Sequence, residues 1–165
     1  MNQLHQIEFQ SPIGIVEITG TDKAIRSILF SEKSKVSAPI SPESPQVLKD
    51  CQQQLEEYFK GQRMDFTVAC ESTGTDFQQK VWTALVDVPY AETVSYGAIA
   101  KAVGSEKAVR AVGNANSKNK LNIVVPCHRI IGATGKLTGY AGTLPRKEWL
   151  LRHEKACREN QSIEQ

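Results

Sequence analysis

The sequence lacks the features of a membrane-spanning or exported protein. Its 165 residues contain no window of about 18 uncharged apolar residues, the length that a membrane-spanning helix needs. The N-terminal residues have neither the basic start nor the apolar core of a signal peptide. We therefore expect a cytoplasmic protein with no membrane partner, whose cysteines stay reduced.

Closely spaced cysteines are also absent. The four cysteines are Cys51, Cys70, Cys127 and Cys157, and no two of them form a CxxC pair. A zinc framework or a thioredoxin-like redox motif is therefore not indicated. Internal repeats and low-complexity tracts are lacking as well. We predict a globular chain with no metal and no cofactor.

Net charge is small, but it is unevenly distributed. The whole chain carries only +2 at pH 7. Residues 1–93 have a net charge of −5, whereas residues 94–147 have a net charge of +8 and contain a single acid, Glu106. A basic segment in a nearly neutral protein favours a polyanion as partner. A basic surface that meets only solvent fits the same pattern, so charge alone leaves both interpretations open.

The first 72 residues have the pattern of an antiparallel sheet with one helix. Three β-branched runs bounded by turn residues predict the strands of a meander, at 7–10, 15–18 and 25–30. After a loop rich in proline and serine, apolar residues at helical spacing predict a helix over 46–59 that stops at Gly61. A further strand is predicted over 64–69.

Residues 73–158 are predicted to form a second, mainly helical lobe. Ser95 is expected to cap a helix over 96–102, and Ser105 to cap another over 106–115. Two helices joined by a glycine-containing turn are typical of a helix-turn-helix, although an ordinary helical hairpin fits the same pattern.

The rest of this lobe is predicted from a cap and from apolar runs. Thr75 and Gln78 have the spacing of a capping box at the start of its first helix. Residues 122–125 form an apolar run that predicts a short strand in a parallel pairing. A last helix is expected over 146–158, followed by a flexible tail, 159–165. The predicted fold class is therefore α+β, with an N-terminal antiparallel sheet lobe that includes a helix and a mainly helical C-terminal lobe.

One cysteine stands in a setting that suits chemistry. Cys127 follows Pro126, where the predicted strand meets a loop, and proline restrains the backbone at this point. A thiol reacts as its thiolate, and an imidazole such as that of His128 can take the proton directly or through a water. Glu154 could orient the imidazole, and Arg129 could add positive potential near the sulfur. A buried structural cysteine beside a satisfied histidine fits the same residues.

Residues 125–130, VPCHRI, resemble the active-site signature of the O6-alkylguanine-DNA alkyltransferases, also called methylated-DNA–protein-cysteine methyltransferases. The resemblance covers roughly residues 73–154, where further motifs occur in the order and spacing of that family. These motifs are VSYG at 94–97, RAVG at 110–113, Asn119, GYAG at 139–142 and KEWLL at 147–151. The first lobe agrees in layout but carries no motif.

The resemblance implies that five residues take part in alkyl transfer. Cys127 corresponds to the alkyl acceptor, His128 to a base that acts through a water, and Glu154 to the carboxylate that orients this base. Asn119 corresponds to a hinge that ties the recognition helix to the active-site strand. Tyr96 corresponds to a tyrosine that disturbs a phosphate and can protonate the leaving guanine. Because the setting is cationic, we also predict a lowered thiolate pKa for Cys127.

The resemblance also implies a DNA-binding surface and a base pocket. Arg110 corresponds to an arginine that fills the gap left by a flipped nucleotide. The small residues around it by themselves suit a narrow surface such as a minor groove, although close packing on a neighbouring helix fits the same residues. The other residues expected to bind DNA are Ser95, Lys107, Ala111 and Arg129. The residues expected to line the base pocket are Val125, whose carbonyl would face the exocyclic amine of guanine, Tyr140, Ala141 and Gly142.

The implied function is repair of double-stranded DNA by one irreversible transfer from O6-alkylguanine to the protein's own cysteine, carried out by a monomer. O4-alkylthymine is left open as a second substrate. Two other functions stay open from the residues alone. A cysteine hydrolase would want a cysteine at a helix N-terminus and a distant histidine with an Asn or Asp partner. A non-catalytic helix-turn-helix regulator would want an effector domain or a dimerisation element. The sequence shows neither pattern.

Overall fold

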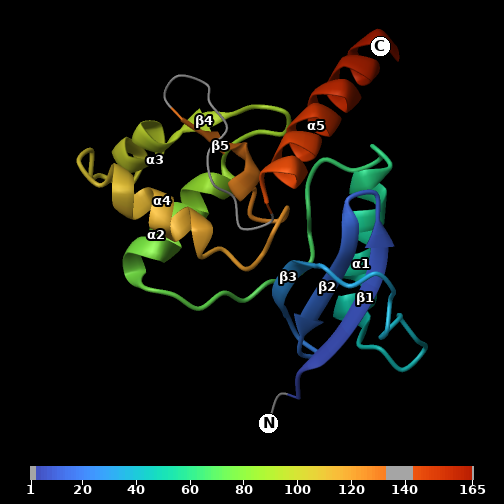
Figure 1. Cartoon of the computed structure of the whole chain (residues 1–165). Coiled ribbons are helices and arrows are strands. Elements are labelled where there is room, and N and C mark those ends of the chain that lie inside the picture. Colours follow the sequence, from blue (N-terminus) through green and yellow to red (C-terminus); the bar gives the residue numbers. More distant parts are fainter. Residues whose placement is uncertain (1–2, 133–142, 165) are drawn as a thin grey trace. The chain divides into compact units, whose positions relative to one another are not determined.

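The computed structural model describes residues 3–132 and 143–164. Contacts between residues divide the chain into two compact units, Met1–Ser72 and Thr73–Gln165. We call them the N-lobe and the C-lobe and describe each by itself (Figure 1). The α+β class predicted from the sequence is confirmed, because the N-lobe contains an antiparallel sheet and the C-lobe is mainly helical.

The N-lobe is a three-stranded antiparallel sheet covered by one helix. The strands follow the chain order β1-β2-β3 and span His5–Ser11, Gly14–Gly20 and Ile25–Ser31. Helix α1, Gln46–Phe59, packs on the sheet and buries its apolar stripe there (Figure 1). The helix ends before Gly61, whose φ of 77° is a conformation that glycine adopts without strain. The three strands and this helix are predicted correctly.

The strand predicted over 64–69 is wrong. One parallel bridge joins Ile25 to Cys70 instead, through hydrogen bonds from Ile25 N to Ala69 O and from Glu71 N to Ile25 O, each 2.8 Å long. Further along the segment, the side chain of Gln54 on α1 binds the backbone N–H and the hydroxyl of Thr67. A side chain from the helix therefore takes a backbone donor that a strand ladder would use.

The C-lobe consists of five helices and a two-stranded parallel sheet in its described residues. These elements are α2 Asp76–Val86, β4 Val94–Ser95, α3 Tyr96–Ala102, α4 Val109–Ser117, the 3-10 helix η1 Cys127–Arg129, β5 Ile130–Ile131 and α5 Leu144–Glu164. Both predicted caps of the first two helices are present. Thr75 and Gln78 form a reciprocal capping box on α2, and the Ser95 hydroxyl accepts the N–H of Ala98 at 3.0 Å.

The second helix of the predicted pair starts later than expected. Helix α4 begins at Val109, not at residue 106, and its N-cap Ala108 makes no side-chain cap. The predicted cap, Ser105, is used otherwise: its N–H bonds back to Ala100 O of α3, and its carbonyl accepts Ala108 N to close a separate turn. The positive φ of Gly104, 81°, sends the chain into that turn.

The strand predicted over 122–125 is also wrong. Asn122 and Val125 form only a local bridge around a tight turn in which Ile123 has a φ of 74°. The bridge is parallel, as the sequence predicts for this segment, but the parallel strand pair of this lobe is formed by β4 and β5. A run of β-branched residues favours a strand locally. Here the amide side chain of Asn119 bonds the N–H of Leu121 and the carbonyl of Val125, and so holds the chain in the turn.

Helix α5 runs six residues past its predicted end at residue 158, up to Glu164. Most of the segment predicted as a flexible tail, 159–165, is therefore helical in the structure. In residues 3–132 and 143–164, none of the helices combines the length and the apolar content needed to cross a membrane.

Candidate active site

The sulfur of Cys127 lies inside the C-lobe and is surrounded by polar side chains. Cys127 starts the 3-10 helix η1, whose short backbone bonds run from Cys127 N to Val125 O at 2.7 Å and from Arg129 N to Pro126 O at 2.9 Å. The residue is fully buried. Its Sγ accepts a hydrogen bond from Asn119 Nδ2 at 3.1 Å and lies 3.7 Å from Asn122 Oδ1, to which the thiol can donate. The thiol is therefore held in one orientation.

Asn119 ties the residues after α4 to the active-site turn, as the resemblance implies for a hinge. Its Nδ2 donates to Val125 O at 3.0 Å as well as to the sulfur, and its Oδ1 accepts Leu121 N at 3.0 Å. The Val125 carbonyl receives both Asn119 Nδ2 and Cys127 N. A base that bonded this oxygen would compete with these two internal donors, and the expected role of Val125 in the base pocket stays a prediction.

His128 is held by a buried carboxylate. Its Nε2 lies 2.6 Å from Glu154 Oε2, and both side chains are fully buried. An ionised carboxylate can only accept a hydrogen bond, so Nε2 carries the proton and Nδ1 carries the lone pair. Within residues 3–132 and 143–164, Nδ1 has no hydrogen-bond partner. The imidazole therefore presents an open base nitrogen.

Arg129 does not bind DNA in this arrangement. Its Nε and Nη2 donate to the two oxygens of Glu154 at 2.9 and 3.1 Å, and its Nη1 donates to Val88 O at 2.8 Å. The residue is only 6% exposed. All its nitrogens are engaged and its charge faces Glu154, which corrects both predicted roles, as a DNA contact and as a charge beside the sulfur.

The site holds its thiol protonated and its imidazole neutral. Burial raises the pKa of Cys127 to about 11, although the hydrogen bond from Asn119 and the charge of Lys147 act in the opposite direction. Burial also lowers the pKa of His128, against the pull of Glu154. Burial opposes ionisation of Glu154 too, but His128 and Arg129 hold its pKa below the ordinary value. The lowered pKa predicted for Cys127 is therefore wrong. A neutral imidazole is instead ready to take its proton.

Two polar residues near the sulfur, Lys147 and Asn122, have no role in the sequence analysis. Lys147 is fully buried, and burial lowers its pKa to about 8 while the nearby Cys127 acts in the opposite direction. A signal for it exists in the sequence. Lys147, Leu150 and Glu154 have the spacing i, i+3, i+7, which places them on one face of a helix, and all three are buried. No comparable signal exists for Asn122.

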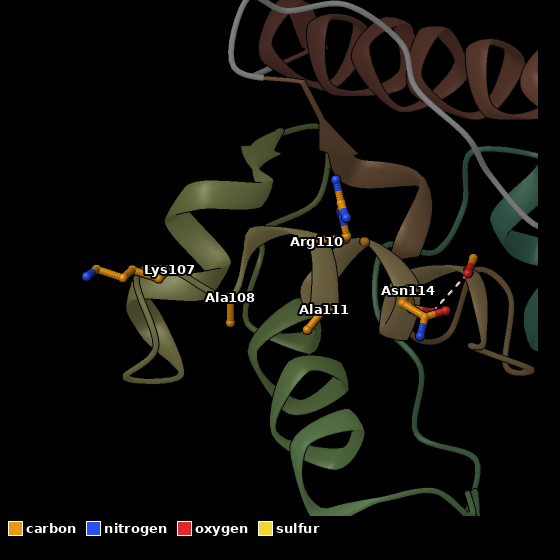
Figure 2. Close-up of a pocket in the computed structure, with 7 residues that line it drawn as sticks. Lys107, Ala108, Arg110, Ala111 and Asn114 are labelled. Atoms are coloured by element: carbon orange, nitrogen blue, oxygen red, sulfur yellow. Dashed lines mark hydrogen bonds between the residues drawn. The ribbon is translucent and has the colours of Figure 1, made fainter.

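The residues expected to bind DNA lie on and before helix α4. Arg110, Ala111 and Asn114 are exposed residues of α4, and Lys107 is exposed on the turn that precedes it (Figure 2). Together with neighbouring small residues they line one open surface pocket, formed by Lys107, Ala108, Arg110, Ala111, Gly113, Asn114 and Ser117.

Tyr96 joins helix α3 to this surface. It is the first residue of α3, and a Cβ atom placed on Gly113 would lie 3.6 Å from its ring. The tyrosine ring thus lies beside Gly113 of α4, where a methyl group would make an ordinary van der Waals contact with it. Ser95 is half-buried, and its oxygen caps α3. The expected base-pocket residues Tyr140, Ala141 and Gly142 lie outside the described residues.

Comparison with known proteins covers both lobes. The family model of the 6-O-methylguanine DNA methyltransferase ribonuclease-like domain matches residues 5–71, and that of the 6-O-methylguanine DNA methyltransferase DNA binding domain matches residues 76–156. The chain is 46% identical to the methylated-DNA–protein-cysteine methyltransferase of Methanosarcina acetivorans over 151 residues, which are 90% of this chain and 97% of that protein.

Solved structures agree with this match. The crystal structure of the Mycobacterium tuberculosis O6-methylguanine methyltransferase is 41% identical, with a TM-score of 0.82 over 93% of this chain and 94% of that one. A structure of Mycobacterium tuberculosis OGT in complex with DNA is 42% identical, with a TM-score of 0.83 over the same shares. The chain belongs to the 6-O-methylguanine DNA methyltransferase family. The resemblance seen in its motifs is confirmed.

Proposed function

We propose that this protein repairs DNA by moving a methyl or larger alkyl group from O6 of guanine to Sγ of Cys127, where the group stays. Membership of the family supports the reaction. The observation that carries it at the level of atoms is the buried thiol of Cys127 beside a neutral imidazole, His128, whose Nε2 is fixed by Glu154 and whose Nδ1 is open. This arrangement suits a thiol that stays protonated until it reacts and then gives its proton to a neighbouring base.

The transfer has three proton movements and one exchange of bonds. Nδ1 of His128 takes the proton of Cys127 through a water, and the sulfur attacks the alkyl carbon. The new S–C bond forms as the C–O6 bond breaks, and the bonding electrons leave with guanine. The guanine takes up a proton from the Tyr96 hydroxyl, which is replaced by the one held on His128. The products are unmodified guanine and a thioether.

The thioether explains why the reaction occurs once. Its sulfur is uncharged and is neither a good leaving group nor a nucleophile. We therefore expect one repaired lesion for each protein molecule, with no cofactor needed. O4-alkylthymine offers the same kind of alkyl–oxygen bond and is a second candidate substrate.

The substrate is double-stranded DNA, bound through the α4 surface shown in Figure 2. A base inside a duplex gives the sulfur no line of attack on its alkyl carbon, so the nucleotide must leave the stack. Small residues such as Ala111 and Gly113 let the α4 backbone approach a minor groove closely, and the exposed Arg110 can occupy the gap. Lys107 adds positive charge beside the phosphates. We expect the protein to act as a monomer in the cytoplasm.

The decisive test is the intact mass of the protein after mixing with a duplex that contains O6-methylguanine. We expect a gain of one methylene mapped to Cys127 and a plateau at one lesion for each protein. The Cys127→Ser variant is the control and should bind the duplex without gaining mass. Turnover beyond one lesion, or release of methanol, would contradict the proposal and favour a hydrolase.

A further inference from the structure

The turn after helix α2 contacts the buried ion pair at three points. It comprises Val88–Ala91, and we call it the clamp turn. The Val88 carbonyl accepts Arg129 Nη1 at 2.8 Å, and the Ala91 N–H donates to Glu154 Oε1 at 3.0 Å. Between them, the ring of Tyr90 lies against the guanidinium, with 5.6 Å from its centroid to Arg129 Cζ.

The backbone of the clamp turn has an unusual conformation at one residue. Ala91 has a φ of 67°, in the left-handed region that side chains other than glycine rarely adopt. Such a conformation persists only where the surrounding structure holds it. At Ala91 it directs the N–H at the Glu154 carboxylate, which receives that bond at a distance of 3.0 Å.

The contacts leave the carboxylate no freedom to turn. Oε1 receives Arg129 Nε and Ala91 N, and Oε2 receives Arg129 Nη2 and His128 Nε2. A rotation of the carboxylate would break at least one of these four bonds. The position of Arg129, set by Val88 and the Tyr90 ring, therefore decides which oxygen faces the imidazole.

We propose that Tyr90 and Ala91 are positioning residues for alkyl transfer: the clamp turn holds the Arg129–Glu154 pair so that His128 keeps its proton on Nε2 and its lone pair on Nδ1. This inference rests on the proposed transfer to Cys127. A guanidinium that lies over an aromatic ring and is cut off from water is strongly attracted to the ring. An aliphatic side chain in place of the ring gives no such attraction.

The test compares Tyr90→Leu with Tyr90→Phe in the full chain. The rate of Cys127 alkylation by free O6-benzylguanine is measured by intact mass, which needs no DNA binding. Tyr90→Leu should lower this rate by about tenfold, the size expected for loss of a desolvated cation–π contact. Tyr90→Phe keeps the ring and should retain most of the rate. A rate in Tyr90→Leu equal to that of the unmodified protein would overturn the proposal. Circular dichroism checks folding, and Tyr90→Met replaces Tyr90→Leu if the latter does not fold.

The same substitution in a His128→Ala protein distinguishes an effect on the position of the imidazole from general damage to the C-lobe. If the ring acts through the imidazole, Tyr90→Leu should cause no further loss in a His128→Ala protein. The same tenfold loss in both backgrounds would show that the ring acts independently of His128 and would overturn the inference.

The tautomer of His128 gives a readout that does not depend on transfer. Nitrogen NMR should show a single Nε2–H tautomer in the unmodified protein and in Tyr90→Phe, and a mixture in Tyr90→Leu. A single tautomer in all three would refute the clamp. Absence of transfer in the unmodified protein would instead contradict the proposed function.

Discussion

Each lobe buries a glutamate, and the two differ in where their hydrogen bonds lead. In the N-lobe, Glu8 is 1% exposed and binds Lys33 Nζ at 2.9 Å, the N–H and hydroxyl of Ser37 at 2.8 and 3.0 Å, and Ala38 N at 3.2 Å. These partners fasten the loop after β3 to the sheet. The contacts end there, because the partners are backbone groups, a hydroxyl and a lysine whose side chain is half exposed.

In the C-lobe, Glu154 binds two side chains of the segment that contains Cys127, His128 and Arg129. One of its oxygens holds His128, which directly follows Cys127 in the chain and whose Nδ1 has no hydrogen-bond partner within residues 3–132 and 143–164. The side chain of its cation, Arg129, is 7% exposed, whereas the Lys33 side chain is 48% exposed. Burial and a cation partner are therefore common to both glutamates. Glu154 differs because it orients an imidazole whose second nitrogen has no hydrogen-bond partner among the described residues, which suits the role in transfer that we propose for it.

The largest effect should come from exchanging the buried thiols, one in each lobe, for hydroxyls. Cys127→Ser should lower alkyl transfer by about 10³-fold or more, because a hydroxyl is a much weaker nucleophile near neutral pH. Cys51, buried in α1, is the matched control. Cys51→Ser should lower the free energy of unfolding by about 1–3 kcal/mol and leave the one-to-one stoichiometry intact. Intact mass measures the transfer, and thermal melts measure the stability. Transfer by Cys127→Ser at the normal rate would contradict the assignment of Cys127 as the alkyl acceptor.

The two glutamates should differ next in their effect on rate. Glu154→Gln should slow transfer by about 10²-fold while DNA binding persists, because the imidazole loses its charged partner. Glu8→Gln should leave the rate unchanged. Glu154→Gln should also lower the free energy of unfolding by about 3–5 kcal/mol, since Arg129 keeps a buried charge, whereas Lys33 can turn to solvent. The rates of transfer from free O6-benzylguanine test the first expectation, and urea melts test the second. Equal rates for the two variants would show that the two glutamates do not differ in their effect on transfer.

A smaller effect, confined to duplex substrates, is expected on the α4 surface. Arg110→Ala removes the exposed side chain that we propose replaces the flipped nucleotide. Repair of a duplex should fall by about tenfold, the loss of one good contact. The reaction with free O6-benzylguanine should stay near that of the unmodified protein. Lys101→Ala, an exposed basic residue at the end of α3, is a control for charge. Equal losses on both substrates would contradict the proposal that Arg110 fills the gap left by the flipped nucleotide.

The smallest expected effect is a pH dependence of stability in the N-lobe. The Lys33 ammonium, with help from Ser37, lowers the pKa of Glu8 from 4.5 to about 2. A lowered carboxylate pKa stabilises the fold above the unfolded value and loses that contribution as pH falls through the folded one. The melting-temperature difference between the unmodified protein and Glu8→Gln should therefore be constant above about pH 5 and shrink between pH 4.5 and 2. A difference that grows toward acid would contradict this assignment.

Elements specified by neighbouring residues are predicted well from the sequence. Helix α1 matches its predicted bounds, Gln46–Phe59, because an apolar stripe and Gly61 define it locally. The capping box of Thr75 and Gln78 is likewise a matter of residues three apart. The motif around Cys127 identified the family for the same reason, since a motif is a local pattern.

Predictions that depended on which partner a group meets, or on how deeply it is buried, failed. The β-branched run at 122–125 favours a strand, yet the Asn119 side chain bonds the backbone on both sides of it and holds a turn. Arg129 has the charge of a DNA contact, but Glu154, which lies 25 residues further along the chain, takes it inward. A cationic sequence around Cys127 suggests an easily ionised thiol, whereas full burial raises its pKa.

The sequence by itself determined the α+β class, the caps at Thr75 and Ser95, helix α1 and the family, because each follows from residue types a few positions apart. Only the tertiary structure decided which nitrogen of His128 stays open, that Arg129 serves Glu154, and that Ala91 directs its N–H at the same carboxylate. The physical reason is that the strength of a charge or a hydrogen bond depends on burial and on partners from other elements. Neither can be read along a single stretch of chain.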